Sequence, residues 1–213
     1  MGLYKSAFAA LYDRFERREH PNTAPVRRRL LEGVDGDILE LGAGTGANFT
    51  YYPATARVTA TDYNPHMLQR ARAAAERSSA EIMVEQANAM RLPFPDASFD
   101  VVVGCLVFCS IRRPGRALQE ARRVLRPGGD LRLFEHVRSP RPAVARLQAV
   151  ASPAWGLVSD GCHLDRNTSA SVRAAGFHIR LVEAVDYKDA PPLRHELILA
   201  SKVTPGAGAE PGF

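Results

Sequence analysis

The stretch Glu40-Leu41-Gly42-Ala43-Gly44-Thr45-Gly46 decides the fold. The apolar run Asp37–Leu41 leads into it, and its three glycines alternate with other residues. Glycine has no Cβ, so this segment can turn sharply and bring its backbone close to a ligand. A buried strand followed by such a turn predicts a nucleotide-type ligand at the carboxyl end of the strand.

Asp62 strengthens this interpretation because it ends the next predicted strand, 22 residues after Glu40. A carboxylate at that position can accept both hydroxyls of a ribose. Glu40 stands two places before the first glycine, where it could orient a cationic or amino-acid ligand. Gly42, Gly44 and Ala47 also satisfy the pattern GxGxx[GA], so this motif alone leaves a nicotinamide cofactor as an alternative.

Short apolar runs alternate with helical segments along the rest of the chain. Strands are expected at 37–41, 58–61, 82–85, 99–103, 130–137, 177–185 and 196–202, and helices at 65–78, 114–125 and near 168–175. Asn64 is the expected cap of the first of these helices, and an irregular region is expected after 137. The last two strands leave no room for a crossover helix, so they should pair antiparallel. The pattern predicts an α/β fold with a mostly parallel seven-stranded sheet, an antiparallel last strand and helices on both faces.

The length of 213 residues suits one domain at 1–203, with a helical lid at 1–30 and a flexible Pro- and Gly-rich tail at 204–213. Ordinary proportions of hydrophobic (46%) and charged (24%) residues suggest that the fold needs no metal or disulfide. Three cysteines cannot all pair, and none lies in a CxxC arrangement, so we expect packed thiols, no metal site and a cytoplasmic protein.

The net charge of +5 comes mainly from arginines that are spread along the chain without interleaved aromatic residues. This distribution argues against nucleic acid as a partner. The segment 3–15 has helical amphipathic spacing that could touch a membrane surface, although a lid is the commoner use of such a helix. We therefore expect a small molecule as the partner, and neither nucleic acid nor a membrane.

Four successive motifs resemble those of class I S-adenosylmethionine-dependent methyltransferases: ILELGAGTGAN (38–48), TATDYNPHML (59–68), LPFPDASFDVVV (92–103) and RRVLRPGGDL (122–131). The resemblance implies a Rossmann-like methyltransferase fold and S-adenosylmethionine as cofactor, with S-adenosylhomocysteine as product. The residues that it implies for cofactor binding are Glu40, Gly42, Ala43, Gly44, Thr45, Gly46, Asp62, Tyr63, Met67, Asn88, Ala89, Met90, Cys105 and Leu106. Many relatives carry Asp at position 88 or 89. Asn88 can still accept a hydrogen bond there, without charge.

The segments at 105–129, 134–140 and 153–177 resemble the small-molecule thiol S-methyltransferases of the methyltransferase-like 7 type, and DGCHL at 160–164 is the distinctive part. A thiol loses its proton easily, and a neutral imidazole could complete the deprotonation. His136, Asp160 and His163 are therefore the candidate catalytic residues. Each also has a structural interpretation: His163 as a helix cap, Asp160 in a tight Asp-Gly turn and His136 as a partner within the sheet.

The sequence is also compatible with other functions. The LPFPDxSFD segment is shared with quinone-pathway enzymes, so a carbon or oxygen acceptor is the main alternative. A lipid acceptor finds support only in the amphipathic N-terminus. A non-enzymatic scaffold that binds the cofactor without turnover is the remaining alternative.

Overall fold

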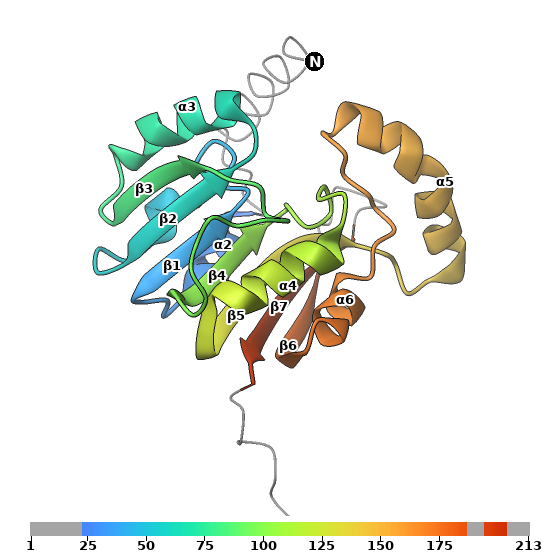
Figure 1. Cartoon of the computed structure of the whole chain (residues 1–213). Helices are drawn as coiled ribbons and strands as arrows, with labels where there is room; N and C mark the ends of the chain where they lie inside the picture. Colours follow the sequence, from blue (N-terminus) through green and yellow to red (C-terminus); the bar gives the residue numbers. More distant parts are fainter. Residues whose placement is uncertain (1–22, 187–193, 204–213) are drawn as a thin grey trace, which may run out of the picture.

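The computed structural model describes residues 23–186 and 194–203. These residues form one seven-stranded sheet in the order β3-β2-β1-β4-β5-β7-β6 (Figure 1). The strands are β1 (Asp37–Leu41), β2 (Arg57–Asp62), β3 (Glu81–Gln86), β4 (Phe99–Cys105), β5 (Leu125–Val137), β6 (Phe177–Asp186) and β7 (Arg194–Lys202). The helices are α2 (Ala24–Leu31), the 3₁₀ turn η1 (Phe49–Tyr51), α3 (Pro65–Ala75), α4 (Pro114–Val124), α5 (Pro142–Val158) and α6 (Thr168–Ala174).

The direction of the strands confirms the predicted fold class. β1 pairs in parallel with β2 and β4, and β3 and β5 continue the parallel sheet on either side. β7 lies between β5 and β6 and is antiparallel to both, so β6 runs with the other strands. The single reversed strand is therefore the last one, as the short connection before it predicted.

Helices cover both faces of the sheet with separate apolar cores. On one face, α4 and α6 pack through Ala117, Leu118 and Val172 against strand residues such as Leu39 and Leu131. On the other face, α2 and η1 contribute Leu30, Leu31 and Phe49, which pack with Ile38, Val103 and Phe134. Two covered faces explain why most residues of the central strands β1 and β4 are buried.

Helix α3 shows how a local signal sets an element. Asn64 caps it as expected, because its side-chain oxygen accepts the His66 amide at 3.0 Å. The helix ends at Ala75, three residues before the predicted end, and the Ser78 hydroxyl that follows donates to the Phe49 carbonyl at 2.9 Å. The predicted helix end was therefore wrong, because Ser78 is used for a tertiary hydrogen bond.

Two other sequence-based expectations are corrected. The irregular region expected after the fifth strand contains α5, a helix of 17 residues that includes Pro153. Its large apolar residues form no buried stripe, since Leu147 is exposed and Val150 is 80% exposed, and this hid the helix in the sequence. β5 begins at Leu125, before the expected start at 130, because Leu125 already pairs with Phe99 across a register irregularity.

The expected lid at 1–30 is described only from residue 23, and its earlier part lies outside the described residues, as does the expected tail at 204–213. The described part includes α2, which packs in the second apolar core through Val26, Leu30 and Leu31. Within 23–186 and 194–203, no helix combines the length and the apolar character needed to cross a membrane.

Candidate active site

A cavity of about 790 Å³ opens at the carboxyl ends of the parallel strands, which is where open α/β sheets bind their ligands. It is bounded by the loop after β1, the end of β2, the loops after β3 and β4, and the segment that follows α5. The predicted site residues that line it are Glu40, Gly42, Ala43, Gly44, Asp62, Tyr63, Met67, Asn88, Ala89, Met90, Cys105, Leu106, His136 and Asp160. Thr45, Gly46 and His163 were predicted as well, and they do not line it.

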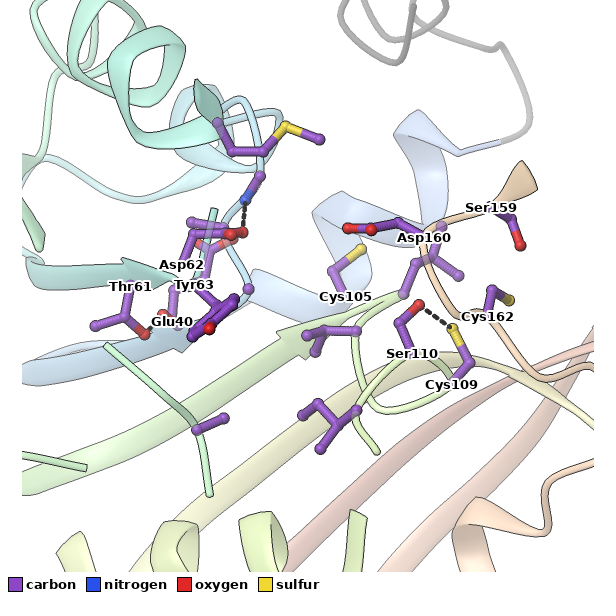
Figure 2. Close-up of a pocket in the computed structure, with 18 of the residues that line it drawn as sticks. Glu40, Thr61, Asp62, Tyr63, Cys105, Cys109, Ser110, Ser159, Asp160 and Cys162 are labelled. Atoms are coloured by element: carbon purple, nitrogen blue, oxygen red, sulfur yellow. Dashed lines mark hydrogen bonds between the residues drawn. The ribbon is translucent and has the colours of Figure 1, made fainter. Parts of the chain in front are cut away.

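Asp62 connects the glycine loop to the end of β2. Its Oδ2 accepts the Gly44 amide at 3.0 Å, and its Oδ1 accepts the Asn64 amide at 2.7 Å, the first of which Figure 2 shows as a dashed line. Burial raises the pKa of this carboxyl. A carboxylate offers about four lone-pair positions, so the backbone amides of Gly44, Asn64 and Tyr63 that bond to it still leave acceptor capacity toward the cavity. This capacity fits a ribose hydroxyl.

The outer glycines of the loop serve packing. A Cβ on Gly42 would lie 2.2 Å from Cγ2 of Val107, and one on Gly46 would lie 2.7 Å from the Phe49 ring. Gly42, Gly44 and Gly46 all have positive φ, at 63°, 58° and 85°. Gly42 and Gly44 line the cavity, whereas Gly46 packs behind it.

Glu40 is almost fully buried and holds the segment that follows the glycine loop. Its Oε1 accepts from the Asn48 side-chain amide and its Oε2 accepts from the Tyr52 hydroxyl, each at 2.8 Å. Burial raises the pKa of Glu40 to about 7. Both oxygens therefore have partners within the chain, so the first role of Glu40 is to position the loop, and a ligand would meet a carboxyl that is already hydrogen-bonded.

The opposite side of the glycine loop offers a surface for a flat ring. Tyr63, which is 62% exposed, and Met67 face this part of the cavity together with the 87–90 loop. Asn88 Oδ1 accepts the Met90 amide at 2.9 Å, so this side chain shapes its own loop. The uncharged Asn88 oxygen, which was expected to accept a hydrogen bond from the ligand, therefore already accepts one within its own loop.

Two ionisable side chains, the buried Glu135 and the half-buried Arg166, hold the loop after β4. Glu135 is fully buried and accepts the amides of Val107, Phe108 and Cys109 at 2.9–3.0 Å. The Arg166 guanidinium donates to the carbonyls of Phe108 and Ile111. Burial raises the pKa of Glu135 and lowers that of Arg166. Sequence reasoning assigned no role to either residue, although both lie in segments that carry the family resemblance, because each is distant in the sequence from the loop that it holds.

Two cysteines and a histidine converge at the far end of the cavity. Nδ1 of His136 lies 3.7 Å from Sγ of Cys109 and 3.5 Å from Sγ of Cys162, and all three residues line the cavity. The hydrogen bond between the two thiols and burial raise the pKa of Cys109, and the same bond lowers the pKa of Cys162. The sequence predicted both cysteines as packed hydrophobes, and their approach to His136 was missed.

Asp160 and His163 lie in the turn that presents Cys162. Asp160 has a φ of 50° and Gly161 a φ of 83°, which is the tight Asp-Gly turn offered as its structural interpretation. Asp160 also lines the cavity, and its charge is close enough to raise the pKa of Asp62 (Figure 2). His163 is exposed, and its backbone amide donates to the Cys109 carbonyl at 2.9 Å. The helix cap proposed for His163 is instead Asn167.

Further residues of the wall were not predicted. Arg27 of α2 is buried, lines the cavity, and donates to Asn48 and to Sγ of Cys105. Trp155 and Val158 come from α5 and give the far end an apolar side. Arg27 lies outside every motif, and the resemblance of 153–177 assigned no role to Trp155 or Val158. Their roles depend on how α2 and α5 reach the strand ends.

Comparison with known proteins places this site in context. Residues 39–133 match the family model described as "Methyltransferase domain". Thiol S-methyltransferase TMT1B of Rattus norvegicus is 40% identical over 187 residues, which cover 82% of this chain and 77% of that protein. Demethylmenaquinone methyltransferase of Thermus thermophilus is 34% identical, and the match covers 68% of this chain and 69% of that one.

Solved structures agree on the fold. A chain from the solved complex that contains the Haloferax volcanii Trm112 methyltransferase activator superposes with a TM-score of 0.73. The match covers 93% of this chain and 97% of that one at 20% identity, so it speaks for the architecture alone.

Proposed function

The chain belongs to the S-adenosylmethionine-dependent methyltransferases, and from that premise we propose that it methylates the sulfur of a small-molecule thiol. The observation that carries the proposal is the continuity of one cavity from Asp62 to Cys109, Cys162 and His136. One end supplies the polar groups that a nucleoside needs. The other end is partly apolar and carries the thiols and the imidazole, which suits a small sulfur compound.

The residues present fit the cofactor. Asp62 has acceptor capacity left for a ribose hydroxyl, and Gly42, Ala43 and Gly44 present backbone to the same space. Tyr63, Met67, Asn88, Ala89 and Met90 would border the adenine, and Cys105 and Leu106 the reactive end. When bound, S-adenosylmethionine supplies an electrophilic methyl group on a sulfonium centre. The chain's own task is then to place the acceptor in line and to remove its proton.

Two titratable side chains lie where the proton of the acceptor would be lost. A thiol with a pKa of about 8.5 is already partly ionised near neutral pH, so a weak base is enough to remove its proton. His136 and Asp160 both line the cavity. His163 is exposed and outside the lining residues, so we assign it a backbone role in holding Cys109.

The competing acceptor is a hydroquinone ring, methylated on carbon or oxygen. The similarity to a demethylmenaquinone methyltransferase favours it, and the apolar side made by Trp155, Val158 and Ile111 could seat a ring. The thiol remains the better proposal because the relative named as a thiol S-methyltransferase is more similar and matches more of the chain.

A screen of the full chain against a panel of small thiols and hydroquinones, with mass detection of methylated products, tests the proposal. We expect thioether products, and a turnover that falls in H136Q and D160N while affinity for S-adenosylhomocysteine stays the same. H163Q is the matched histidine variant and should keep most of the turnover. Methylated hydroquinones without thioethers would refute the thiol assignment.

A further inference from the structure

Cys109, His136 and Cys162 have the geometry of a metal site that faces the cavity. Their three ligand atoms, two Sγ and one Nδ1, all lie within 4.8 Å of one another. Tetrahedral Zn²⁺, with Zn–S near 2.3 Å and Zn–N near 2.0 Å, keeps a sulfur and a nitrogen ligand about 3.5 Å apart. The observed N···S distances are 3.5 and 3.7 Å. The imidazole nitrogen therefore already stands at nearly the separation from each sulfur that Zn²⁺ requires, and the two sulfurs lie within 4.8 Å of each other.

Backbone bonds hold the two cysteines in this arrangement. The Cys109 amide donates to Glu135 at 3.0 Å, and the Cys109 carbonyl accepts the His163 amide at 2.9 Å. This second bond ties the segment of Cys162 directly to that of Cys109. The Cys162 amide in turn donates to the Ser159 carbonyl at 3.2 Å, across the turn with positive φ at Asp160 and Gly161. Fixed ligand positions of this kind favour metal binding, because little order has to be created when the ion arrives.

The third ligand is oriented by its neighbours in the sheet. His136 pairs with His195 across β5 and β7, and their ring centroids lie 4.4 Å apart. The His195 ring also stacks on Phe134, with the centroids 5.2 Å apart. The imidazole of His136 therefore stands on a packed aromatic layer while its Nδ1 lies near the two sulfurs.

We propose that Cys109, His136 and Cys162 bind a thiophilic divalent cation, Zn²⁺ in the first instance, whose fourth position opens into the cavity and receives the sulfur of the acceptor. Sites with three protein ligands and one open position are the catalytic type of zinc site. This inference rests on the proposed function, and it makes His136 a ligand instead of a base. Asp160, which also lines the cavity, stays free to act on the proton.

The chemistry balances without an oxidant or reductant. The acceptor R–SH loses its proton to solvent by way of the Asp160 carboxylate when its sulfur binds, because a coordinated thiol is deprotonated. The thiolate sulfur then forms the S–CH₃ bond as the bond between the methyl group and the sulfonium breaks. The product R–S–CH₃ is a neutral thioether, which is a weaker ligand than the thiolate, so it leaves the metal. The two cysteine thiolates balance the charge of the ion, which offsets the cost of burying it.

Metal binding can be measured without any turnover. The full chain, stripped with a chelator under reducing conditions, is titrated with Zn²⁺ and with Co²⁺. We expect one ion per chain, and a thiolate-to-cobalt charge-transfer absorption with the d–d bands of a tetrahedral site. C109S, C162S and H136Q should each weaken binding by more than about 100-fold, since losses in the outer shell alone cost about 10–100-fold.

Matched variants separate this site from other thiols and imidazoles. Cys105 lines the same cavity outside the cluster, and His178 is exposed on β6, so C105S and H178Q should keep the bound ion. Circular dichroism identifies any variant that fails to fold. If one of the three ligand variants does not fold, the other two still test the site. A C109S/C162S protein that still binds the ion, or a wild-type chain that forms a Cys109–Cys162 disulfide and takes up no metal after reduction, would overturn the proposal.

The role in the reaction is tested separately. Adding a small thiol to the Co²⁺ protein should shift the charge-transfer band, and the corresponding alcohol should not. Chelated enzyme that methylates thiols at an unchanged rate would refute the activating role while the thiol methyltransferase function stands. A protein that binds the ion tightly and methylates no thiol would refute the proposed function while the metal site stands.

Discussion

The Asp62 carboxylate accepts the backbone amide of Gly44 at 3.0 Å, across the ends of two neighbouring parallel strands. This bond joins Asp62, the acidic residue at the end of β2, directly to the glycine loop. Because the other oxygen accepts the Asn64 amide, the carboxylate also shapes the turn into α3. The ligand-facing loop and the proposed ribose acceptor are thus one unit, and a change at Asp62 should affect both.

Replacing Asp62 with Asn should weaken cofactor binding strongly. The amide nitrogen of Asn would face one of the backbone donors, and the charge offered to the ribose hydroxyl would be lost. Hydrogen bonds to charged groups contribute about 1.5–3 kcal/mol, which corresponds to a roughly 10- to 100-fold higher Kd. Calorimetric titration with S-adenosylhomocysteine measures it. D35N, at an exposed carboxyl outside the cavity, is the control, and equal affinities in the two variants would contradict the assignment.

The strands of the sheet and the antiparallel direction of the last one could be predicted from the sequence, because the signals for them are local. Apolar runs marked the buried strands, and the short connection between the last two strands predicted their antiparallel pairing, as β6 and β7 show. Helix α5 was missed because a buried stripe is what identifies a helix from its sequence, and its residues Leu147 and Val150 are exposed.

The two ends of the cavity differ in how far they could be predicted. Asp62 and Gly44 belong to motifs with fixed spacing, so their positions at neighbouring strand ends follow from the fold. Cys109 and Cys162 lie 27 and 26 residues from His136 along the chain, on different elements. They meet only because the loop after β4 and the turn after α5 both fold over the end of β5. No spacing rule carries that information.

Replacing Gly42 with Ala should destabilise the fold for two separate reasons. The new Cβ would lie 2.2 Å from Val107, and the residue would have to keep a φ of 63°. Overpacking costs about 1–3 kcal/mol and a left-handed conformation about 1–2 kcal/mol, so we expect a loss of about 2–5 kcal/mol. Urea unfolding followed by circular dichroism measures the loss.

The chain contains a control for each part of that effect. Gly33 has nearly the same φ, 65°, but an added Cβ would meet nothing within 4 Å, so G33A should cost only the backbone part. Adding V107A to G42A should recover the overpacking part, which a double-mutant cycle isolates. Equal losses in G42A and G33A would show that contact with Val107 does not matter.

Replacing Glu135 with Gln should loosen the loop after β4. The carboxylate accepts three backbone amides, and a Gln side chain would put its own donor against one of them. An unsatisfied buried donor costs about 1–3 kcal/mol, so the free energy of unfolding should fall by that amount. The KM for the acceptor should rise more than the KM for the cofactor, because Cys109 and Ser110 lie at the acceptor end.

An exposed carboxyl provides the comparison for Glu135. Glu183 pairs with Arg29 at the surface, and such pairs contribute about 0–1 kcal/mol, so E183Q should be close to neutral. Steady-state kinetics with each substrate varied in turn completes the test. A rise of both KM values by the same factor would mean that Glu135 supports the whole domain and not the loop in particular.

Glu40 should make the fold less stable as the pH rises toward neutrality. Burial raises its pKa in the folded chain to about 7 from an ordinary value of 4.5. Between these values the folded chain holds a proton that the unfolded chain has released, so the free energy of unfolding falls with increasing pH. The Glu40 contribution is fully present below about pH 4.5 and is lost as the pH passes about 7, a change of at most about 3 kcal/mol.

E40Q stays neutral, accepts from Asn48 and donates to the Tyr52 hydroxyl, so it should remove this slope in urea titrations between these pH values. E76Q, at an exposed carboxyl, should keep the slope. Parallel curves for wild type and E40Q would mean that Glu40 is ionised throughout, and that its two hydrogen bonds outweigh burial.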